Sequence, residues 1–331
     1  MKRGANSEAG AALVTVLVML AIMSALAIVI TDAARFSLRR TANQAQMDQA
    51  RWYLLGAENY AATRITRITQ QLSTDLPIDQ EQWQGRPFLY PLDDGDMTIT
   101  LFDGGNCFNL NSVVERPQAG PYVASARGQL QFARLLDLVG VRVEGGLAAS
   151  LADWIDSDQQ AALGGGEDEI YSRGEAPYRT ANTLIADIGE LRRVRGFDAE
   201  TVARIAPFVC VRPTEAPSVL NVNALTSEQA PLLAMVIPDL SIDGAREVIR
   251  SRPRGGWRDL NEFFQQPRLI GLELNEPTRA QFALTSSYFV MQARVERAEF
   301  AERSAALIRM DGSRGRVVRR LFGVGGAERV L

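Results

Sequence analysis

Histidine is absent from this chain of 331 residues. Its absence removes the commonest general base of enzymes, the Ser-His-Asp triad and every zinc or iron site that needs an imidazole ligand. The sequence also lacks a phosphate-binding P-loop, a dinucleotide fingerprint and a nucleophile elbow. A glycosidase with two carboxylates is the one enzyme class that a linear sequence leaves open. We therefore expect a protein that is not an enzyme.

The chain also lacks a large excess of acidic or basic residues, with 39 Asp and Glu against 36 Lys and Arg. The formal net charge is -3, so no overall field would attract a phosphate backbone, although arginine is abundant and could be clustered locally. Nucleic acid is therefore not expected as a partner.

Cysteine is scarce, with only Cys107 and Cys210 in the chain. An even number of cysteines in an exported protein is typical of disulfide pairing. One bond between them would close a loop of roughly 100 residues and stabilise the fold by about 4 to 5 kcal/mol. Two unrelated buried thiols are the alternative.

The N-terminus contains an uncharged run from Ala11 to Ile30 without Gly or Pro, which is long enough to cross a bilayer as a helix. It is longer than the apolar part of a secretory signal peptide, which favours a retained anchor. Lys2 and Arg3 precede it and should stay in the cytoplasm, so the rest of the chain is expected on the far side of the membrane. Helix-forming residues continue beyond the run, and they predict one helix of about 60 residues that enters the folded domain.

Short strands are expected on both sides of a long central segment. Met97–Phe102 alternates apolar and polar residues, and the sequence CFNLNSV follows a Gly104-Gly105 turn, which predicts a hairpin. Three further strands should begin near Tyr288, Arg303 and Arg316 and form a β-meander.

The central segment, residues 122–282, has helical periodicity and almost no strand signal. Helix starts are indicated at Asp198, Thr226 and Asp259, whose side-chain oxygens can accept hydrogen bonds from free backbone amides. The pattern predicts an α+β fold, in which a long N-terminal helix packs on a small antiparallel sheet. A large all-helical domain is inserted between the two sheet-forming halves, residues 35–121 and 283–331.

An acidic segment lies inside the helical region. From Asp153 to Glu175 the sequence DWIDSDQQAALGGGEDEIYSRGE has seven carboxylates and one basic residue, Arg173. Calcium would compensate this charge, because it binds oxygen ligands with flexible geometry and needs neither His nor thiolate. The segment lacks the EF-hand pattern, and its spacing alone favours a calcium site and a solvated acidic loop equally.

The leader carries a specific family resemblance. A short basic stretch ending in Gly10, followed directly by AALVTVLVMLAIMSALAIVI, resembles the leader of type IV pilin-like proteins. The resemblance implies that prepilin peptidase removes residues 1–10 after Gly10 and methylates Ala11, leaving residues 11–34 as the transmembrane part of the helix. Most pilins have Glu at the fifth mature position, where this chain has Thr15. That departure, together with the helical insertion, resembles the K-type minor pseudopilins of the type II secretion system.

This resemblance implies a place and a role. The protein would be a single-pass protein of the bacterial inner membrane with its C-terminal domain in the periplasm. It would form the tip of the pseudopilus with the I-type and J-type minor pseudopilins and support export of folded proteins across the outer membrane. It also implies structural calcium, with ligands carried over from the acidic segments of the family: Asp156, Asp158, Glu167, Asp168, Asp153, Glu169 and Asn182.

A second resemblance gives the alternative function. PSVLNVNALTSEQAPLLAM followed by IDGAREVIRSRPRGGWRDLNEFF resembles the helix-hairpin-helix module of competence-type DNA-binding proteins. In that module backbone amides of a Gly hairpin contact phosphate, helped by nearby basic residues. Only Gly244 remains of the usual paired glycines, although Arg246, Arg250, Arg252, Arg254 and Arg258 supply charge. The alternative is therefore a membrane-anchored DNA-binding protein.

Overall fold

The computed structural model describes residues 5–72, 83–141, 146–173, 176–297, 300–312 and 314–323. Lys2 and Arg3 of the predicted leader and Glu175 of the acidic segment lie outside these ranges. The chain divides into two compact units, Met1–Tyr53 and Leu54–Leu331. We describe each unit by itself.

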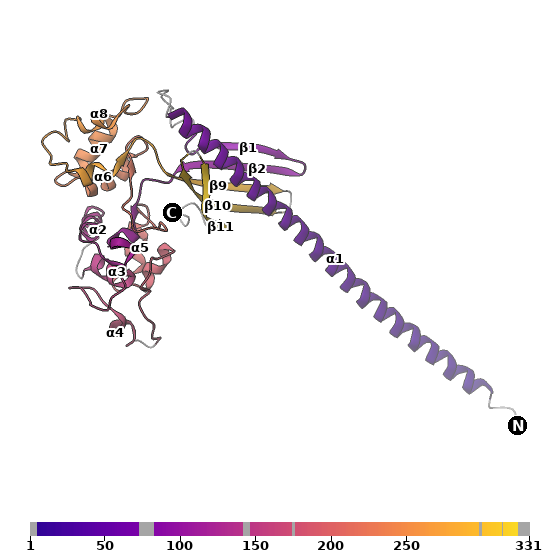
Figure 1. The fold of residues 1–331 in the computed structure, drawn as a ribbon. Coiled ribbons are helices and arrows are strands. Elements are labelled where there is room, and N and C mark those ends of the chain that lie inside the picture. Colours follow the sequence, from indigo (N-terminus) through magenta and orange to yellow (C-terminus); the bar gives the residue numbers. More distant parts are fainter. Residues whose placement is uncertain are drawn as a thin grey trace. The chain divides into compact units, whose positions relative to one another are not determined.

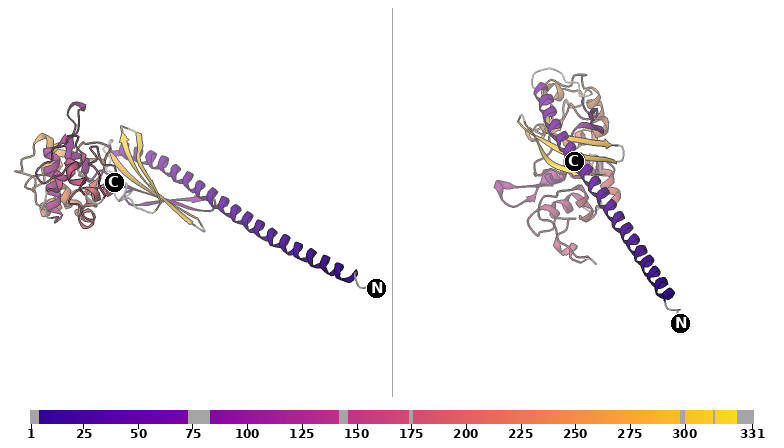
Figure 2. Two further views of the ribbon diagram at one scale, coloured as in Figure 1. Left: turned by 90° about the horizontal axis from the view of Figure 1, so that it is seen from below. Right: turned by 90° about the vertical axis from the view of Figure 1, so that its right-hand side faces the viewer.

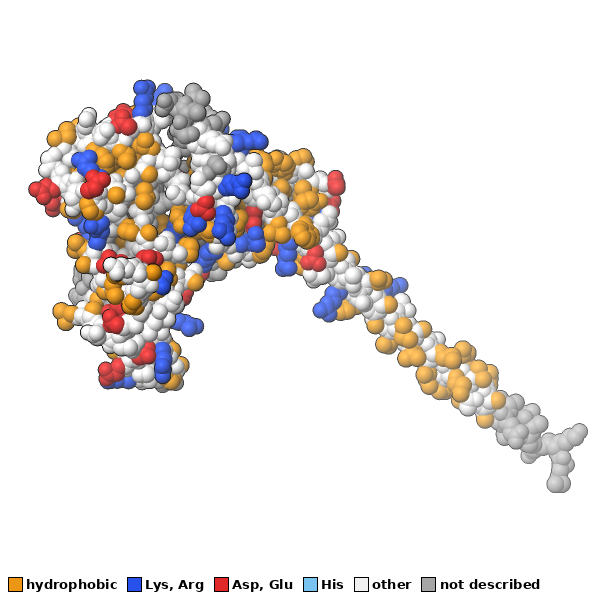
Figure 3. Space-filling view, viewed as in Figure 1, with side chains coloured by type: hydrophobic (Ala, Val, Ile, Leu, Met, Phe, Trp, Pro, Cys, Tyr) orange, Lys and Arg blue, Asp and Glu red, His pale blue; other side chains and the backbone are white. Residues whose placement is uncertain are grey.

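A single helix, α1 (Ala5–Leu72), provides the described part of the first unit and enters the second. In the first unit its apolar side chains are exposed, and Figure 3 shows them covering this part of the helix. An 18-residue window within Gly10–Gln70 has a mean hydropathy of 3.0 and is 0% buried. By length and composition, α1 is therefore able to cross a membrane.

The second unit contains a five-stranded sheet with strand order β1-β2-β9-β10-β11 (Figure 1). Every neighbouring pair is antiparallel. The predicted α+β class and the C-terminal meander are confirmed. The strands are β1 (Pro87–Leu92), β2 (Gly95–Asp103), β9 (Tyr288–Arg297), β10 (Phe300–Asp311) and β11 (Arg314–Phe322).

The last turns of α1 lie across one face of this sheet (Figure 2). Their buried side chains recur every three or four residues, as a helix with one core-facing stripe requires: Leu54, Ala57, Ala61, Ile65 and Ile68. Tyr60 contacts Tyr90 of β1 edge to face at 5.1 Å between ring centroids. The buried carboxylate of Glu58 forms an ion pair with Arg320 of β11. Helix and sheet are thus joined at both edge strands.

The predicted hairpin between Met97–Phe102 and the CFNLNSV segment is wrong. Strand β2 pairs with β1, and the turn between them contains Asp93 and Asp94. The CFNLNSV segment instead leaves the sheet: its two-residue strand β3 (Phe108–Asn109) pairs in parallel with β6 (Val209–Cys210). Its asparagines explain why, because Asn109 and Asn111 donate side-chain hydrogen bonds to carbonyl groups near residue 214. These long-range bonds satisfy backbone groups of the helical region.

Helices predominate between the two halves of the sheet. All three predicted starts are confirmed, since Asp198 and Asp259 are the N-caps of α5 and α8 and Thr226 is also an N-cap. Thr226 begins a short 3-10 helix that leads into α6. The helices are α2 (Ala126–Leu138), α3 (Leu147–Ile155), α4 (Asp168–Tyr171), α5 (Ala199–Ile205), α6 (Ala230–Val236), α7 (Ile242–Arg250), α8 (Leu260–Phe264) and α9 (Glu276–Arg279). They surround a core in which Phe132 stacks on Phe108 at 5.2 Å.

The sheet and the helical region meet at a buried polar junction. Asp103, at the end of β2, accepts hydrogen bonds from Ser286 at 2.6 Å and from the side chain of Asn221 at 2.9 Å. The guanidinium of Arg212 stacks on the ring of Tyr288 at 4.0 Å, and burial lowers the pKa of this arginine to about 10. Next to it, Cys107 and Cys210 form the predicted disulfide. Charge, stacking and a covalent bond therefore hold one small region together.

Candidate metal centre

The end of helix α3 positions the first acidic residues of the site. All nine residues of α3 are buried, because its sequence LAASLADWI is almost entirely apolar and packs in the core of the helical region. Asp153 lies in the last turn of α3, and Asp156 follows directly as the C-cap. The chain then returns through Gly164, Gly165 and Gly166 to Glu167, which begins α4. Residues from a helix end and a returning loop therefore face each other.

Gly165 shows how closely the loop approaches the helix. A Cβ atom at this position would collide with the carboxylate of Asp153. The same carboxylate oxygen, Oδ2, accepts hydrogen bonds from the backbone N–H groups of Ala162 at 2.9 Å and Gly166 at 2.8 Å. A residue without a side chain is needed here, because only then can the backbone come this close to the acid.

Asp153, Asp156 and Glu167 form a buried carboxylate cluster, in which one oxygen from each lies within 4.8 Å of the others. Only 1%, 3% and 5% of these residues' surface is exposed. Oδ1 of Asp156 and both carboxylate oxygens of Glu167 are buried and have no hydrogen-bond partner among the described residues. Buried polar atoms are nearly always paired, so these three oxygens need an explanation.

The pKa values of the three carboxyl groups are raised because the groups are buried. Burial raises the pKa of Asp156 to about 7, and the charges of Asp158 and Asp153 add to the effect. Burial also raises the pKa of Glu167 to about 7, with contributions from Asp156 and Asp153. Burial raises the pKa of Asp153, although the bonds from Ala162 and Gly166 oppose it. Close carboxylates cannot all ionise unless a positive charge lies between them.

No described arginine forms an ion pair with any member of the buried carboxylate cluster. The donor set consists of oxygen alone, without His or thiolate. Hard cations that bind six to eight oxygens, such as calcium, prefer this chemistry. The cluster therefore fits a hard divalent cation.

The other predicted ligands lie around this cluster. Asp158 is exposed, and one of its carboxylate oxygens accepts a bond from the backbone N–H of Gln160. Asp168 accepts two bonds from Thr180, at 2.9 Å from the backbone and 2.8 Å from the hydroxyl, and they hold its pKa below the usual value. Asn182 accepts a bond from the same hydroxyl. Glu169 pairs instead with Arg173 on the surface.

Sequence reasoning missed an aromatic wall beside the cluster. The ring of Trp154 contacts those of Tyr171 at 5.1 Å and Tyr178 at 6.0 Å, and Tyr171 is 5.3 Å from Tyr178. These rings pack on one another where α3 ends, and Tyr171 and Trp154 are buried there. The signal was present in the sequence, since Trp154 and Tyr171 lie within the acidic segment.

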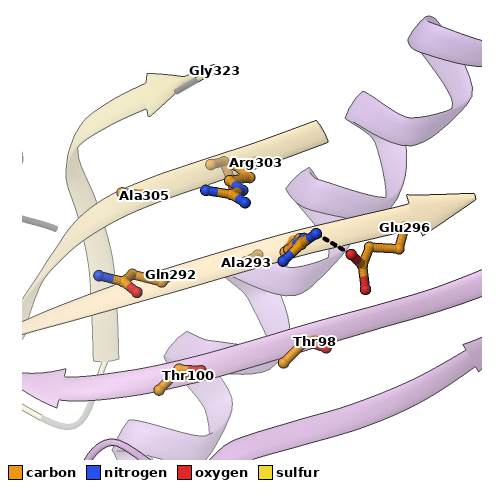
Figure 4. A pocket seen from close by; sticks show the side chains of 10 residues that line it. Thr98, Thr100, Gln292, Ala293, Glu296, Arg303, Ala305 and Gly323 are labelled. Atoms are coloured by element: carbon orange, nitrogen blue, oxygen red, sulfur yellow. Dashed lines mark ion pairs between the residues drawn. The ribbon is translucent and has the colours of Figure 1, made fainter. Parts of the chain in front are cut away.

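A separate hollow of 340 Å³ lies on the sheet, lined by polar side chains of β2, β9 and β10 (Figure 4). Its one carboxylate, Glu296, already forms an ion pair with Arg294 of the same strand. Thr98, Gln292 and Arg303 are among the other residues that line it. Glu296 is the only acid among the described residues that line this hollow.

The arginines of the predicted helix-hairpin-helix segment have other partners. Arg246 forms an ion pair with Asp243 in α7. Arg252 donates hydrogen bonds to the backbone carbonyls of Val222 and Leu225. Arg252 thus links segments of the helical region, while the pair of Arg246 and Asp243 lies on its surface.

The predicted processing residues, Gly10 and Ala11, lie in helix α1. A side chain added at Gly10 would meet nothing within 4 Å. The identity of Gly10 therefore has no explanation in the packing of the helix, and the assignment as a cleavage position stays a prediction.

Comparison with known proteins identifies the family. Two family models, both described as type II secretion system (T2SS), protein K, match residues 106–214 and 220–285. The second match contains all but the first three residues of the helix-hairpin-helix segment, and the DNA-binding alternative gains no support. Type II secretion system protein K of Pectobacterium carotovorum subsp. carotovorum is 33% identical over 96% of this chain and 97% of its own. The protein of the same name from Klebsiella pneumoniae is 33% identical over 96% and 98%.

A solved structure agrees with the sequence relatives. One chain of the crystal structure of the GspK-GspI-GspJ complex from the enterotoxigenic Escherichia coli type 2 secretion system matches this fold with a TM-score of 0.72. It is 28% identical, and the match covers 86% of this chain and all of that one. The chain therefore belongs to the protein K family of the type II secretion system.

Proposed function

We propose that this protein is a minor pseudopilin that forms the tip of the periplasmic pseudopilus with the I-type and J-type minor pseudopilins. The role is assembly in support of the export of folded proteins, not catalysis. One observation carries the proposal most directly: the fold matches, over 86% of the chain, a chain from a complex that contains GspI and GspJ. The unbroken apolar helix supports it, because pilin-like subunits pack through such helices.

The same helix supports a membrane location for the protein before assembly. Its uncharged run is about as long as the hydrocarbon core is thick. We place residues 11–34 across the bacterial inner membrane, with the folded domain in the periplasm, where a disulfide can form and persist. Prepilin peptidase would remove residues 1–10.

The second part of the proposal is structural calcium at the buried carboxylate cluster. Asp153, Asp156 and Glu167 would hold the ion, since three of their oxygens are buried without partners. Bound there, calcium supplies the positive charge that the cluster lacks. It would tie the end of α3 to the start of α4 and so fix a loop that has few apolar contacts of its own. Asp158, Asp168, Glu169 and Asn182 stay predicted ligands.

Replacing Gly10 with Leu is expected to abolish removal of the leader and with it incorporation into the pseudopilus. The bulky side chain would lie at the bond that the peptidase cuts. The measurement is the intact mass and N-terminal sequence of the protein after co-expression with prepilin peptidase, together with secretion of a folded substrate. Gly56→Ala is the matched control, because it lies in the same helix and also has nothing within 4 Å. Normal processing of Gly10→Leu, or a wild-type protein that still begins at Met1, would contradict the proposal.

Calcium affinity is expected to fall as the pH is lowered through 7. The folded-state pKa values of Asp156 and Glu167, about 7, lie above the ordinary values of 3.8 and 4.5. Protons therefore occupy these groups below pH 7, and calcium must displace them, so the affinity should drop roughly 100-fold between pH 8 and pH 6. The measurement is calorimetric titration at both pH values.

The calcium-free protein should show the opposite trend in stability. A carboxyl group whose pKa is raised on folding contributes stability below that pKa, and the contribution is lost as the pH rises from about 4 to about 7. Equal calcium affinity at pH 6 and pH 8 would contradict the raised pKa values of these two side chains.

A further inference from the structure

The first unit has a short basic segment directly after its apolar run. The mature segment from Ala11 to Arg40 has four charged residues: Asp32, Arg35, Arg39 and Arg40. All four are exposed on α1. None of the three arginines forms an ion pair with a residue in the described part of the chain. One acid cannot neutralise three guanidinium groups, so this segment has a net positive charge.

The spacing of these arginines along the helix matches the position of lipid headgroups. With 1.5 Å of rise per residue, Arg35 lies about 7.5 Å and Arg40 about 15 Å beyond Ile30. The headgroup layer extends only about 5 to 7 Å beyond the hydrocarbon core. Helical side chains tilt toward the N-terminus, however, so all three arginines extend back toward the membrane. Long basic side chains reach such an interface by snorkelling.

The residues between the arginines also indicate that this segment lies at a membrane interface. Phe36 and Leu38 are each 70% exposed, which is unfavourable for large apolar side chains in water. A membrane interface accommodates both kinds of residue, because apolar side chains enter the acyl boundary while the cations stay among the headgroups. Arginine, moreover, binds phosphate oxygens through two parallel hydrogen bonds.

Removal of the leader leaves the segment from Arg35 to Arg40 with the first basic side chains of the mature protein. Lys2 is the only lysine of the chain, and it leaves with Arg3 when residues 1–10 are cut. The mature protein then has no basic side chain before Arg35. The basic side chains that flank the membrane-spanning helix therefore lie at one end of it.

We infer that Arg35, Arg39 and Arg40 bind the headgroups of acidic phospholipids and fix the depth of the helix in the membrane until the subunit enters the pseudopilus. The inference rests on the membrane location proposed above. It adds an interaction surface, with anionic phospholipid as the partner.

The test uses the full-length mature protein reconstituted into phosphatidylcholine vesicles that contain phosphatidylglycerol. Electron paramagnetic resonance of spin-labelled lipids measures how strongly each lipid associates with the protein. We expect spin-labelled phosphatidylglycerol to associate at least about five-fold more strongly than spin-labelled phosphatidylcholine, since each arginine near an anionic surface contributes about this factor. The variant Arg35→Gln/Arg39→Gln/Arg40→Gln should show a ratio near one.

Two further variants separate charge from other effects. Replacing the same three arginines with lysine should keep most of the preference, because the charge is retained. Arg51→Gln is the matched control, since Arg51 is exposed on the same helix but lies about 30 Å beyond Ile30. This variant should behave like the wild type.

The other possible results of this experiment would reject either the lipid-binding inference or the proposed membrane location. Equal association of the two lipids with the wild type, or an unchanged preference in the glutamine variant, would overturn the inference. If the wild type shows no preference and the glutamine variant fails to assemble with the I-type and J-type subunits, the arginines serve a protein contact and the lipid assignment is wrong. Absence of any protein-associated lipid, of either kind, would reject the membrane location itself.

Discussion

Replacing both Cys107 and Cys210 with Ser is expected to lower the free energy of unfolding by about 4 to 5 kcal/mol. The two cysteines are 103 positions apart, and the bond between them restricts the unfolded chain over that whole length. The melting temperature should fall by roughly 10 to 15 °C, given the size of the second unit. Thermal and urea unfolding of the mature protein, followed by far-ultraviolet circular dichroism, measures both quantities.

The local structure gives the reason for so large an effect. Strands β3 and β6 are only two residues long and share two residue pairs, so hydrogen bonds alone hold them weakly. The guanidinium of Arg212 also contacts Sγ of Cys107 at 3.3 Å, which links the disulfide to the polar junction below the sheet. Loss of the bond therefore loosens two long-range connections at once.

A reducing agent supplies the matched control. It should destabilise the wild type toward the double serine variant and leave that variant unchanged. A double variant within about 1 kcal/mol of the wild type would mean that the remaining contacts of the junction suffice, which contradicts the large value expected from chain entropy.

Removing calcium is expected to lower the melting temperature by roughly 5 to 10 °C. At a calcium concentration one hundred times the dissociation constant, binding to the folded state contributes about 2.7 kcal/mol. The measurement is differential scanning calorimetry at pH 8 with calcium and with chelator. Terbium luminescence gives an independent readout, because the indole of Trp154 lies next to Asp153 in α3 and can sensitise a lanthanide bound there.

Variants of single ligands separate binding from folding. Asp156→Asn and Glu167→Gln should remove the response to calcium, yet the calcium-free forms should be at least as stable as the wild type. Neutralising a buried carboxyl group removes the cost of burying its charge, which is the main reason for its raised pKa, and also the repulsion from neighbouring acids. Glu169→Gln is the control, because Glu169 is exposed and pairs with Arg173. A melting temperature that chelator leaves unchanged, or a response that survives in Asp156→Asn and Glu167→Gln, would reject calcium at this cluster.

Much of the fold could be predicted because its signals are local. An uninterrupted run of helix-forming residues specifies α1, and side-chain oxygens at Asp198 and Asp259 specify helix starts. The same holds for β9, β10 and β11, which follow one another with short turns. The partner of β2 could not be read in this way. Gly104 and Gly105 suggested a turn, but they lie where the chain leaves the sheet.

The sequence identified the acidic segment that contains the candidate site, but not which of its carboxylates come together. Seven carboxylates in the acidic segment identified the region, while only the folded loop decides which of them are buried. Asp153 is brought to the cluster because Gly165 allows close approach. Asp168 turns to Thr180, which comes from beyond the segment. Contacts of this kind depend on the path of the backbone, and residue spacing alone does not specify it.

The pairing of β2 with β9 has a consequence for how the chain folds. Asp103 and Ser286, which meet at the junction, are separated by 183 positions, so β2 is synthesised long before its neighbour β9. Loop closure over that distance delays the pairing, because contacts remote in sequence form slowly. The helical region lies between these two strands in the sequence, so its folding shortens the loop that the pairing has to close. Until then β2, which pairs with β1 on one side, has an unpaired edge on the other.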